Sequence, residues 1–388
     1  MTRRGHTEGP SHASGVAPLT RRVALVGLSW ISIDPAGAPS NPALGTAIPY
    51  SHASALAAIP DVQVVAGCDI VEGARDKFRD RWDSRWPGVR TYADYREMLE
   101  RERPDVVGVA TPDHLHMEPV LAAIANGAKG ILCEKPIATS LEEADRMVAA
   151  IEAAGTIVNI NYTRRWLPEW VEARRMIADG ELGRLSQIVV QLGGPRAMLF
   201  RNHTHAIDLI QYLAGADPKW VIAELEPGFE DYGIGYAGDG GNDPASEPGA
   251  NYYVGFENGV RAYVTGMKDT IAAEMLVVLV GPKGRVVVDL EGIRLHGMEN
   301  TDVRTTAGVP SVRPINPKWT IAGIQAAWQD LFTALDTGRQ VQCTPQSARQ
   351  TAALTEAILI SQQRGNVRVR LSELPLPVAT GLPTARSV

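Results

Sequence analysis

Residues 106–148 have the sequence VVGVATPDHLHMEPVLAAIANGAKGILCEKPIATSLEEADRMV. The apolar runs at 106–111 and 130–133 have the length of buried strands, and the segment between them, 119–126, has the apolar spacing of a helix that ends at Gly127. A strand, a helix and a second strand at this spacing predict a right-handed crossover between parallel strands. We therefore expect an open α/β sheet whose ligand crevice lies beyond the carboxyl ends of its strands.

Polar residues follow both of these predicted strands. Thr111-Pro112 lies at the end of the first strand, and Glu134-Lys135-Pro136 comes after the second. A lysine that is partly desolvated in such a crevice can hydrogen-bond a substrate hydroxyl and help to move its proton. Lys135 is therefore our first catalytic candidate, and the alternative is a surface lysine in a turn before proline.

The two halves of the chain have different patterns. In the first half we expect strands at 23–27 and 62–68 and helices at 50–58, 74–81 and 95–102, which predicts an N-terminal doubly wound parallel sheet. From about Ser186, strands at 188–192, 220–225, 252–256, 260–265, 275–280 and 285–290 follow one another, so a C-terminal α+β domain with a large, mostly antiparallel open sheet is expected. Helices at 205–213 and 324–335 are expected to cover one face of that sheet, which leaves the other for self-association.

These patterns divide the chain into a loosely ordered leader (1–20), a nucleotide-binding domain (21–158), a substrate and oligomerisation domain (159–371) and a Pro-rich tail (372–388). Arg21-Arg22 before an apolar run resembles a twin-arginine export signal, but the run is short and is needed as the first strand. No segment has the roughly 20 apolar residues of a membrane span. We predict no membrane association.

Charge and cysteine content narrow the class of protein further. The net charge of −6 offers no basic surface for nucleic acid or for an anionic membrane. The three cysteines lie far apart in the sequence, without a CxxC pair, which is typical of a reducing compartment. We expect a cytoplasmic enzyme that acts on a small molecule.

The first turn contains an altered dinucleotide fingerprint. Gly27 is followed by Leu28, Ser29 and Trp30, and a long insertion then extends to Pro49, so the usual glycine spacing is broken. Ser29 and the backbone near Trp30 are our candidates for contacts to the pyrophosphate. Asp69, at the end of the second strand, is expected to bind the adenosine ribose and to favour NAD over NADP. The alternative is a simple strand-end turn with a solvated carboxylate.

A second cluster of polar residues lies at 201–215, in the sequence RNHTHAIDLIQYLAG. His205 and Asp208 are one helical turn apart, and His205 could take up the proton that hydride transfer releases. His203, His205 and Asp208 could instead bind a metal, but no further ligand cluster supports this, and a helix-capping histidine is a third interpretation. We expect no metal site.

The segment Glu226 to Asn251 is a long, glycine-rich and acidic connector. Loops of this length are often lids or binding loops, and the alternative is a surface excursion without a role in binding.

Several segments occur in order and together resemble the Gfo/Idh/MocA oxidoreductases from about Val23 to Arg370. They are VALVG, VVAGCD, VATPDHLH, CEKPIATSLEEADRMV, NYTRRWLPEW, IADGELG and THAIDLIQYLAG. The resemblance implies an N-terminal Rossmann domain, a C-terminal open sheet and NAD(P) chemistry on sugars or cyclitols. It also implies a homodimer or homotetramer that assembles through the face of the C-terminal sheet.

The resemblance also implies roles for individual residues. Lys135 and His205 match residues that contact the reacting hydroxyl, whereas Thr111, Pro112, His116 and Glu134 match residues that line the cofactor. Arg165 matches a crevice residue close to nicotinamide or substrate. Separately from the resemblance, we expect His203 to contact the substrate. Many members have an aspartate where this chain has Arg201, so Arg201 is expected either to bind a substrate carboxylate or phosphate or to pair with Asp208.

Together these features predict an NAD-dependent dehydrogenase that oxidises a secondary hydroxyl of a sugar, glycoside or cyclitol, with C3 of a sugar as one position that the resemblance allows. Lys135, His205 and Asp208 are the expected catalytic residues. Two alternatives stay open: a glycosidase that uses NAD for transient oxidation, and a regulator that binds NAD without catalysis.

Overall fold

The computed structural model describes residues 20–34, 49–270, 275–299, 309–318 and 321–374. The expected leader, most of the Pro-rich tail and most of the insertion after Trp30 lie outside the described residues.

The first sheet has six parallel strands in the order β3-β2-β1-β4-β5-β6, which confirms the predicted doubly wound topology. Its strands are β1 (Arg21–Val26), β2 (Val62–Cys68), β3 (Arg90–Tyr92), β4 (Val106–Val109), β5 (Gly130–Cys133) and β6 (Ile157–Ile160). Val26 pairs with Val109, and Val109 pairs with Cys133, so the carboxyl ends of the central strands are aligned. The loops that follow these strands therefore meet at one edge of the sheet.

Local sequence signals explain where the surrounding helices begin and end. They are α1 (Trp30–Ile33), α2 (His52–Ala57), α3 (Glu72–Trp82), α4 (Tyr95–Glu102), α5 (Met117–Ala125) and α6 (Leu141–Ala154). The Ser140 hydroxyl caps α6 by accepting a hydrogen bond from the backbone N–H of Glu143, and Gly155 ends the helix in the left-handed conformation. This cap holds the segment that follows Lys135.

The second sheet has nine strands in the order β14-β13-β12-β11-β7-β10-β9-β8-β15. They are β7 (Gln187–Gly193), β8 (Pro218–Leu225), β9 (Ala250–Phe256), β10 (Arg261–Met267), β11 (Met275–Gly281), β12 (Gly284–Asp289), β13 (Gly292–Glu299), β14 (Val309–Ile315) and β15 (Val369–Arg370). Only the β7–β10 pair is parallel among the described pairs. The mostly antiparallel sheet is therefore confirmed.

The helices of the second half are divided between the two cores. α7 (Pro168–Ala178) and α8 (Thr204–Ala214) pack with the second sheet, as expected for α8. The expectation for 324–335 is wrong: α9 (Gly323–Thr337) buries Ile324, Trp328 and Leu331 in the core of the first sheet. Its apolar stripe is complementary to β5, β6 and α2, so the chain returns to the first domain after completing the second sheet.

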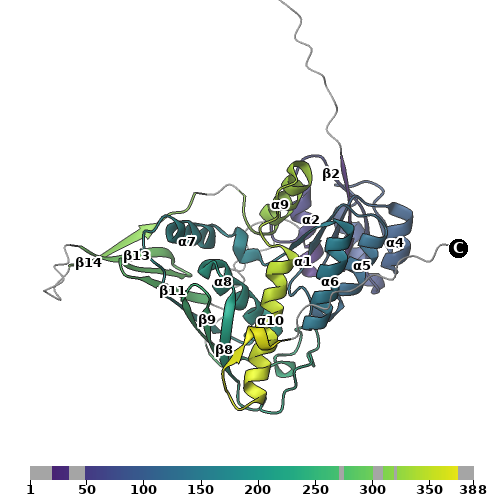
Figure 1. Cartoon of the computed structure of the whole chain (residues 1–388). Helices are drawn as coiled ribbons and strands as arrows, with labels where there is room; N and C mark the ends of the chain where they lie inside the picture. The colour runs from purple at the N-terminus through teal and green to yellow at the C-terminus, as the bar shows by residue number, and fades with distance from the viewer. Residues whose placement is uncertain (1–19, 35–48, 271–274, 300–308, 319–320, 375–388) are drawn as a thin grey trace, which may run out of the picture.

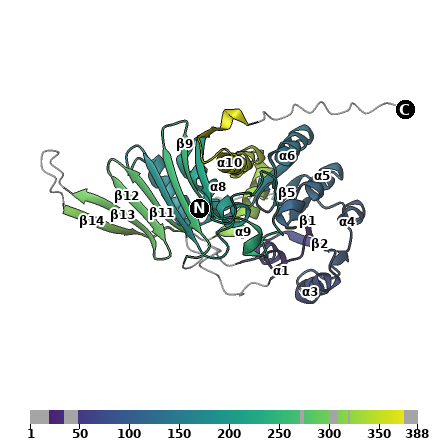
Figure 2. The ribbon, with the colours of Figure 1, turned by 90° about the horizontal axis from the view of Figure 1, so that it is seen from below.

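A long helix that the sequence analysis did not identify, α10 (Pro345–Gln363), joins the two halves. It packs against β8, α8 and α6, and Figures 1 and 2 show it between the two sheets. Within the described ranges, none of the helices combines the length and the apolar character that a membrane span requires.

Candidate functional site

A cavity of about 240 Å³ lies at the carboxyl ends of β1, β4 and β5, where segments of the second half cover it. It brings together eight of the predicted site residues: Ser29, Trp30, Thr111, Pro112, Glu134, Lys135, Arg201 and His205. Nine other residues complete the lining: Ile31, Ala110, Asp113, Thr163, Arg164, Arg196, Asn202, Gly240 and Asn242. Lys135 and His205, which are distant in sequence, therefore share one cavity.

Lys135 lies in this cavity with only 8% of its surface exposed. Its Nζ donates a hydrogen bond to the backbone carbonyl of Arg201 at 2.9 Å. Burial and the nearby charge of Arg201 together lower the pKa of Lys135 to about 8, although Asp113 and Glu134 oppose the shift. A lysine with this pKa can take up and release a proton near neutral pH.

Glu134 is held as a carboxylate by a chain of buried donors. The indole N–H of Trp328 can only donate, so Nδ1 of His52, at 3.1 Å, accepts, and Nε2 of His52 must carry the proton that it donates to Glu134 at 2.9 Å. Asn161 donates to the same carboxylate oxygen at 2.6 Å. Although burial raises the pKa of Glu134, these hydrogen bonds lower it to about 2. His52, on α2, was not found from the sequence because its partners are distant in the chain.

His205 is buried against the edge of the Tyr162 ring, with 6.1 Å between the ring centroids. Its Nδ1 atom has no hydrogen-bond partner among the described residues. Burial lowers the pKa of His205 well below its usual value, and the charges of Arg164, Lys135, Arg201 and Arg196 lower it further. His205 is therefore neutral over the physiological pH range.

Of the two roles expected for Arg201, pairing with Asp208 is not found in the structure. Arg201 forms an ion pair with Asp113, at 3.1 Å, and not with Asp208. Asp208 instead accepts two hydrogen bonds from Nε and one from Nη2 of Arg165, which is buried and also donates to Ser347. The structure places neither Arg165 nor Asp208 in the lining of the cavity. Arg164 lines the cavity in place of Arg165, which was the expected residue.

Arg164 was missed because adjacent residues of a tight turn point in different directions. The segment after β6 forms a 3-10 turn, η3 (Thr163–Trp166), and a sequence pattern does not fix the phase of so short a turn. Arg196 lies in the loop after β7 and had no motif to identify it.

Two of the predicted histidines lie outside the cavity lining. His203 accepts a hydrogen bond from the backbone N–H of Ala250 at 3.3 Å and lies 3.4 Å from the Tyr252 hydroxyl, so it faces the second sheet. His116 contacts the carbonyls of Pro136 and Thr111 at 2.6 and 3.1 Å, which connects the two loops that hold Lys135 and Thr111. Both side chains have structural contacts at these positions. His203 and His205 thus have different surroundings.

The residues at the ends of β1 and β2 fit a dinucleotide. Gly27 has a φ of +86°, and a Cβ atom added there would lie 2.5 Å from the Ala110 carbonyl, so only glycine allows the β1 loop to approach β4 this closely. The Asp69 carboxylate accepts hydrogen bonds from the N–H groups of Leu28 and Val71, at 2.8 and 2.9 Å, and stays partly exposed. It can therefore still accept hydrogen bonds from ribose hydroxyls.

The glycine-rich connector at 226–251 reaches the cavity. Gly240 and Asn242 belong to its lining, and Tyr236 stacks on His114 with 5.8 Å between the ring centroids. The Tyr236 hydroxyl also lies 3.1 Å from Glu247, a buried residue that anchors the connector to Phe200. This segment therefore forms part of the cavity wall.

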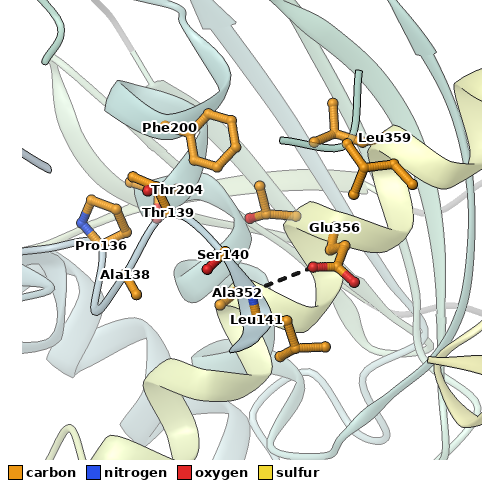
Figure 3. A pocket seen from close by; sticks show the side chains of 12 residues that line it. Pro136, Ala138, Thr139, Ser140, Leu141, Phe200, Thr204, Ala352, Glu356 and Leu359 are labelled. Atoms are coloured by element: carbon orange, nitrogen blue, oxygen red, sulfur yellow. Dashed lines mark hydrogen bonds between the residues drawn. The ribbon is translucent and has the colours of Figure 1, made fainter. Parts of the chain in front are cut away.

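A smaller hollow of about 10 Å³ lies on the other side of the segment that follows Lys135 (Figure 3). Figure 3 shows Glu356 of α10 accepting a hydrogen bond from the N–H of Leu141, at the start of α6. The hollow is about the size of one water molecule, so it is a packing feature between α6 and α10 and not a ligand site. Within the described residues, no group of three or more His, Cys, Asp or Glu side chains could hold a metal ion.

Known proteins with similar sequences or folds support the interpretation of this edge. A family profile described as "Oxidoreductase family, NAD-binding Rossmann fold" matches residues 43–162. The inositol 2-dehydrogenase of Salmonella typhimurium is 27% identical over 173 residues, which are 42% of this chain and 50% of the relative, so the match spans only half of that protein. The D-apiose dehydrogenase of Paraburkholderia graminis is 26% identical over 85% of this chain and 89% of its own length.

The similarity in structure extends over nearly the whole chain. The WlbA dehydrogenase of Bordetella pertussis, solved with NADH and UDP-GlcNAcA, has a TM-score of 0.68 at 19% identity, and the match covers 92% of this chain and 99% of that one. The sequence matches and the shared two-sheet architecture agree with each other. Residues 43–162 therefore match the Gfo/Idh/MocA family of oxidoreductases, and the chain as a whole shares the two-sheet fold of the WlbA dehydrogenase.

Proposed function

We propose that this protein is an NAD-dependent dehydrogenase that moves hydride between a secondary hydroxyl carbon of a sugar, glycoside or cyclitol, such as C3 of a sugar, and nicotinamide. The observation that carries the proposal is the position of Lys135 and His205 in one cavity, at the edge of the parallel sheet where dinucleotides bind. The relatives named inositol 2-dehydrogenase and D-apiose dehydrogenase support a polyhydroxylated substrate.

NAD is the proposed cofactor because Asp69 stands at the end of β2, where a carboxylate binds ribose hydroxyls and repels a 2′-phosphate. Ser29 and Trp30 would contact the pyrophosphate side of the dinucleotide, and Thr111, Pro112 and Glu134 would line its nicotinamide end. When bound, NAD supplies the ring that accepts the hydride.

The pKa values of the two central residues suggest how the proton moves. His205, whose pKa is well below the usual value, is a weak base, whereas Lys135 has a pKa of about 8. We therefore assign the proton of the substrate hydroxyl to the Nζ of Lys135 and give His205 the task of orienting that hydroxyl. This assignment differs from the expectation that His205 is the base, because burial, together with the four surrounding cations, disfavours its protonated form.

Other residues keep these two groups in position. The carbonyl of Arg201 holds the Nζ of Lys135, and the hydrogen bonds of Glu134 to His52 and Asn161 fix the loop that precedes it. We also propose a homodimer or homotetramer that forms through the open face of the second sheet, where Val189 and Tyr263 are each more than a third exposed.

The test uses the intact protein. Gentle denaturation followed by mass measurement identifies any nucleotide that the purified protein carries, and a screen of sugars, cyclitols and glycosides with NAD then follows the absorbance of reduced nicotinamide. We expect reduced cofactor to accumulate with at least one polyol. Cleavage of a glycoside without net reduction would favour the glycosidase, and bound nucleotide with no hydride exchange would favour the regulator.

A further inference from the structure

The cavity has more positive than negative groups. Four basic side chains line it, Lys135, Arg164, Arg196 and Arg201, whereas the acidic ones are Asp113 and Glu134. Both carboxylates already have partners, because Glu134 is bound by His52 and Asn161, and Asp113 by Arg201. Among the described residues, the other two arginines therefore have no ion-pair partner in the lining, although Asp113 attracts Arg196 from a distance.

Arg164 and Arg196 have no carboxylate within 4.0 Å among the described residues. Arg164 is buried with 6% of its surface exposed. The Arg196 side chain is only partly buried, but its Nε atom is fully buried and has no hydrogen-bond partner within the described ranges. Asp208 attracts Arg164 only from a distance, because its carboxylate is held by Arg165. Buried guanidinium groups without partners are unfavourable unless a ligand supplies an anion.

The basic groups also lie close to one another and surround the proposed reaction centre. All four lower the pKa of His205, and Arg201 lowers that of Arg196. They come from three segments: Lys135 follows β5, Arg164 belongs to η3, and Arg196 and Arg201 lie just before and within η4 (Leu199–His203). A neutral polyol would bring only hydroxyl groups to this cluster and would leave the repulsion unrelieved.

We propose that the substrate of this protein carries an oxyanion, a carboxylate or a phosphate, which Arg164 and Arg196 bind beside the hydroxyl that is oxidised. The proposal rests on the proposed function and narrows its substrate to acidic or phosphorylated polyols. The planar fork of a guanidinium matches both oxyanions in bidentate fashion, and the bond is stronger because both partners are charged.

The phosphates of the cofactor are the competing occupant of this cluster. Arg196 acts electrostatically on Tyr50, which stacks on Trp30 at 5.3 Å between ring centroids, so Arg196 is also near the proposed pyrophosphate side. Arg164, by contrast, comes from the loop after β6 and acts on His205 more strongly than any other charge. A substitution of Arg164 therefore tests binding of the substrate anion more directly than a substitution of Arg196.

The experiment measures binding first, so that it does not depend on turnover. The protein loaded with NAD is titrated by calorimetry with glucose, glucuronate and glucose 6-phosphate. The same titration is made with galactose and galacturonate. We expect at least one anionic form to bind about tenfold to hundredfold more tightly than its neutral parent. Glucuronate and glucose 6-phosphate distinguish a carboxylate from a phosphate.

Variants then assign the effect to residues. Arg164→Gln and Arg196→Gln should each weaken binding of the anionic sugar about tenfold or more, while the affinity for NAD, titrated without sugar, changes less than about threefold. Arg101→Gln, at an exposed helix position where the charge pairs with Glu97, is the matched control and should bind like the wild type. Arg164→Lys keeps the charge and should fall between the wild type and the glutamine variant.

Two results would overturn the proposal. In the first, no anionic sugar binds more tightly than its neutral parent. In the second, both glutamine variants lose more affinity for NAD than for the anionic sugar. The second result would assign the arginines to the cofactor. Failure of the proposed function can be distinguished from failure of this proposal. If an anionic sugar binds through the arginines but no reduced nicotinamide forms, the anion site is supported and the dehydrogenase activity is rejected.

Discussion

The Nζ of Lys135 and the backbone carbonyl of Arg201 are 2.9 Å apart and form a hydrogen bond that links the two halves of the molecule. Lys135 is the second residue after β5 of the parallel sheet, whereas Arg201 lies in η4, just before α8 of the second half. The lysine is thus fixed in a buried position among other cations. Its lowered pKa follows from this position.

The rate of substrate oxidation should depend on the protonation of Lys135. Because burial lowers its pKa to about 8, the neutral amine that accepts the hydroxyl proton becomes abundant as the pH rises. We expect kcat/KM for oxidation to rise with pH and to level off above the pKa, with a midpoint near 8. A profile that is flat, or that falls through this range, would contradict the assignment of the proton to Lys135.

Replacing Glu134 with glutamine should change both stability and the pH profile. The side-chain amide would place its NH₂ or its weaker carbonyl acceptor against the donors of His52 and Asn161, at a cost of about 1–3 kcal/mol. The negative charge of Glu134 also raises the pKa of Lys135, so its loss should move the midpoint to lower pH. Urea unfolding and pH-rate profiles measure the two effects, with Glu118→Gln, at an exposed position, as the control. An unchanged midpoint would argue against this coupling.

The Arg165–Asp208 ion pair should contribute to folding and not to proton transfer. Asp208→Asn leaves the Arg165 guanidinium buried without its counter-charge, and we expect a loss of about 3–5 kcal/mol in the free energy of unfolding. The double variant Arg165→Met with Asp208→Leu removes both charges and should recover much of that loss. If Asp208→Asn kept its stability and lost about hundredfold in kcat, Asp208 would have the catalytic role predicted from the sequence.

The protein should lose stability when it is acidified. Burial lowers the pKa of His203 to about 3 in the folded state, whereas in the unfolded chain this histidine takes up a proton below about pH 6.5. The stability is therefore complete above pH 6.5 and declines below it, by up to about 1.4 kcal/mol per pH unit for this single proton. Glu134, with its pKa of about 2, adds a further loss below about pH 4.5. Urea unfolding at a series of pH values measures the slope, and His203→Gln should make it shallower between about pH 6.5 and 4.5.

Much of the scaffold could be predicted from the sequence because it depends on local signals. β2, α4 and β5 have the predicted bounds, and the Ser140 cap and the Gly155 stop of α6 follow from adjacent residues. α9 was assigned to the wrong core because its apolar stripe does not reveal which sheet it covers. Helix period predicts that a face is buried, but the partner is decided by tertiary packing.

The site was predicted where a motif fixes a residue at the end of a strand, and missed where distant segments meet. Lys135 and Glu134 follow β5 directly, and His205 opens α8, so sequence position alone located them. The partner of Arg201 is Asp113, which lies 88 residues earlier in the chain, and no local pattern indicates such a pairing. The proximity of Arg164 and Arg196, neither of which has an ion-pair partner among the described residues, likewise becomes visible only when the cavity lining is assembled.

The most direct test of the central claim compares Lys135→Ala with the wild type in a single turnover of protein loaded with NAD and saturated with an accepted polyol. The variant Lys219→Ala, which removes an exposed lysine, is the matched control. We predict that Lys135→Ala binds NAD with unchanged affinity and forms reduced nicotinamide about hundredfold or more slowly, because general acid–base catalysis contributes that much. Formation of reduced nicotinamide at the wild-type rate would contradict the account.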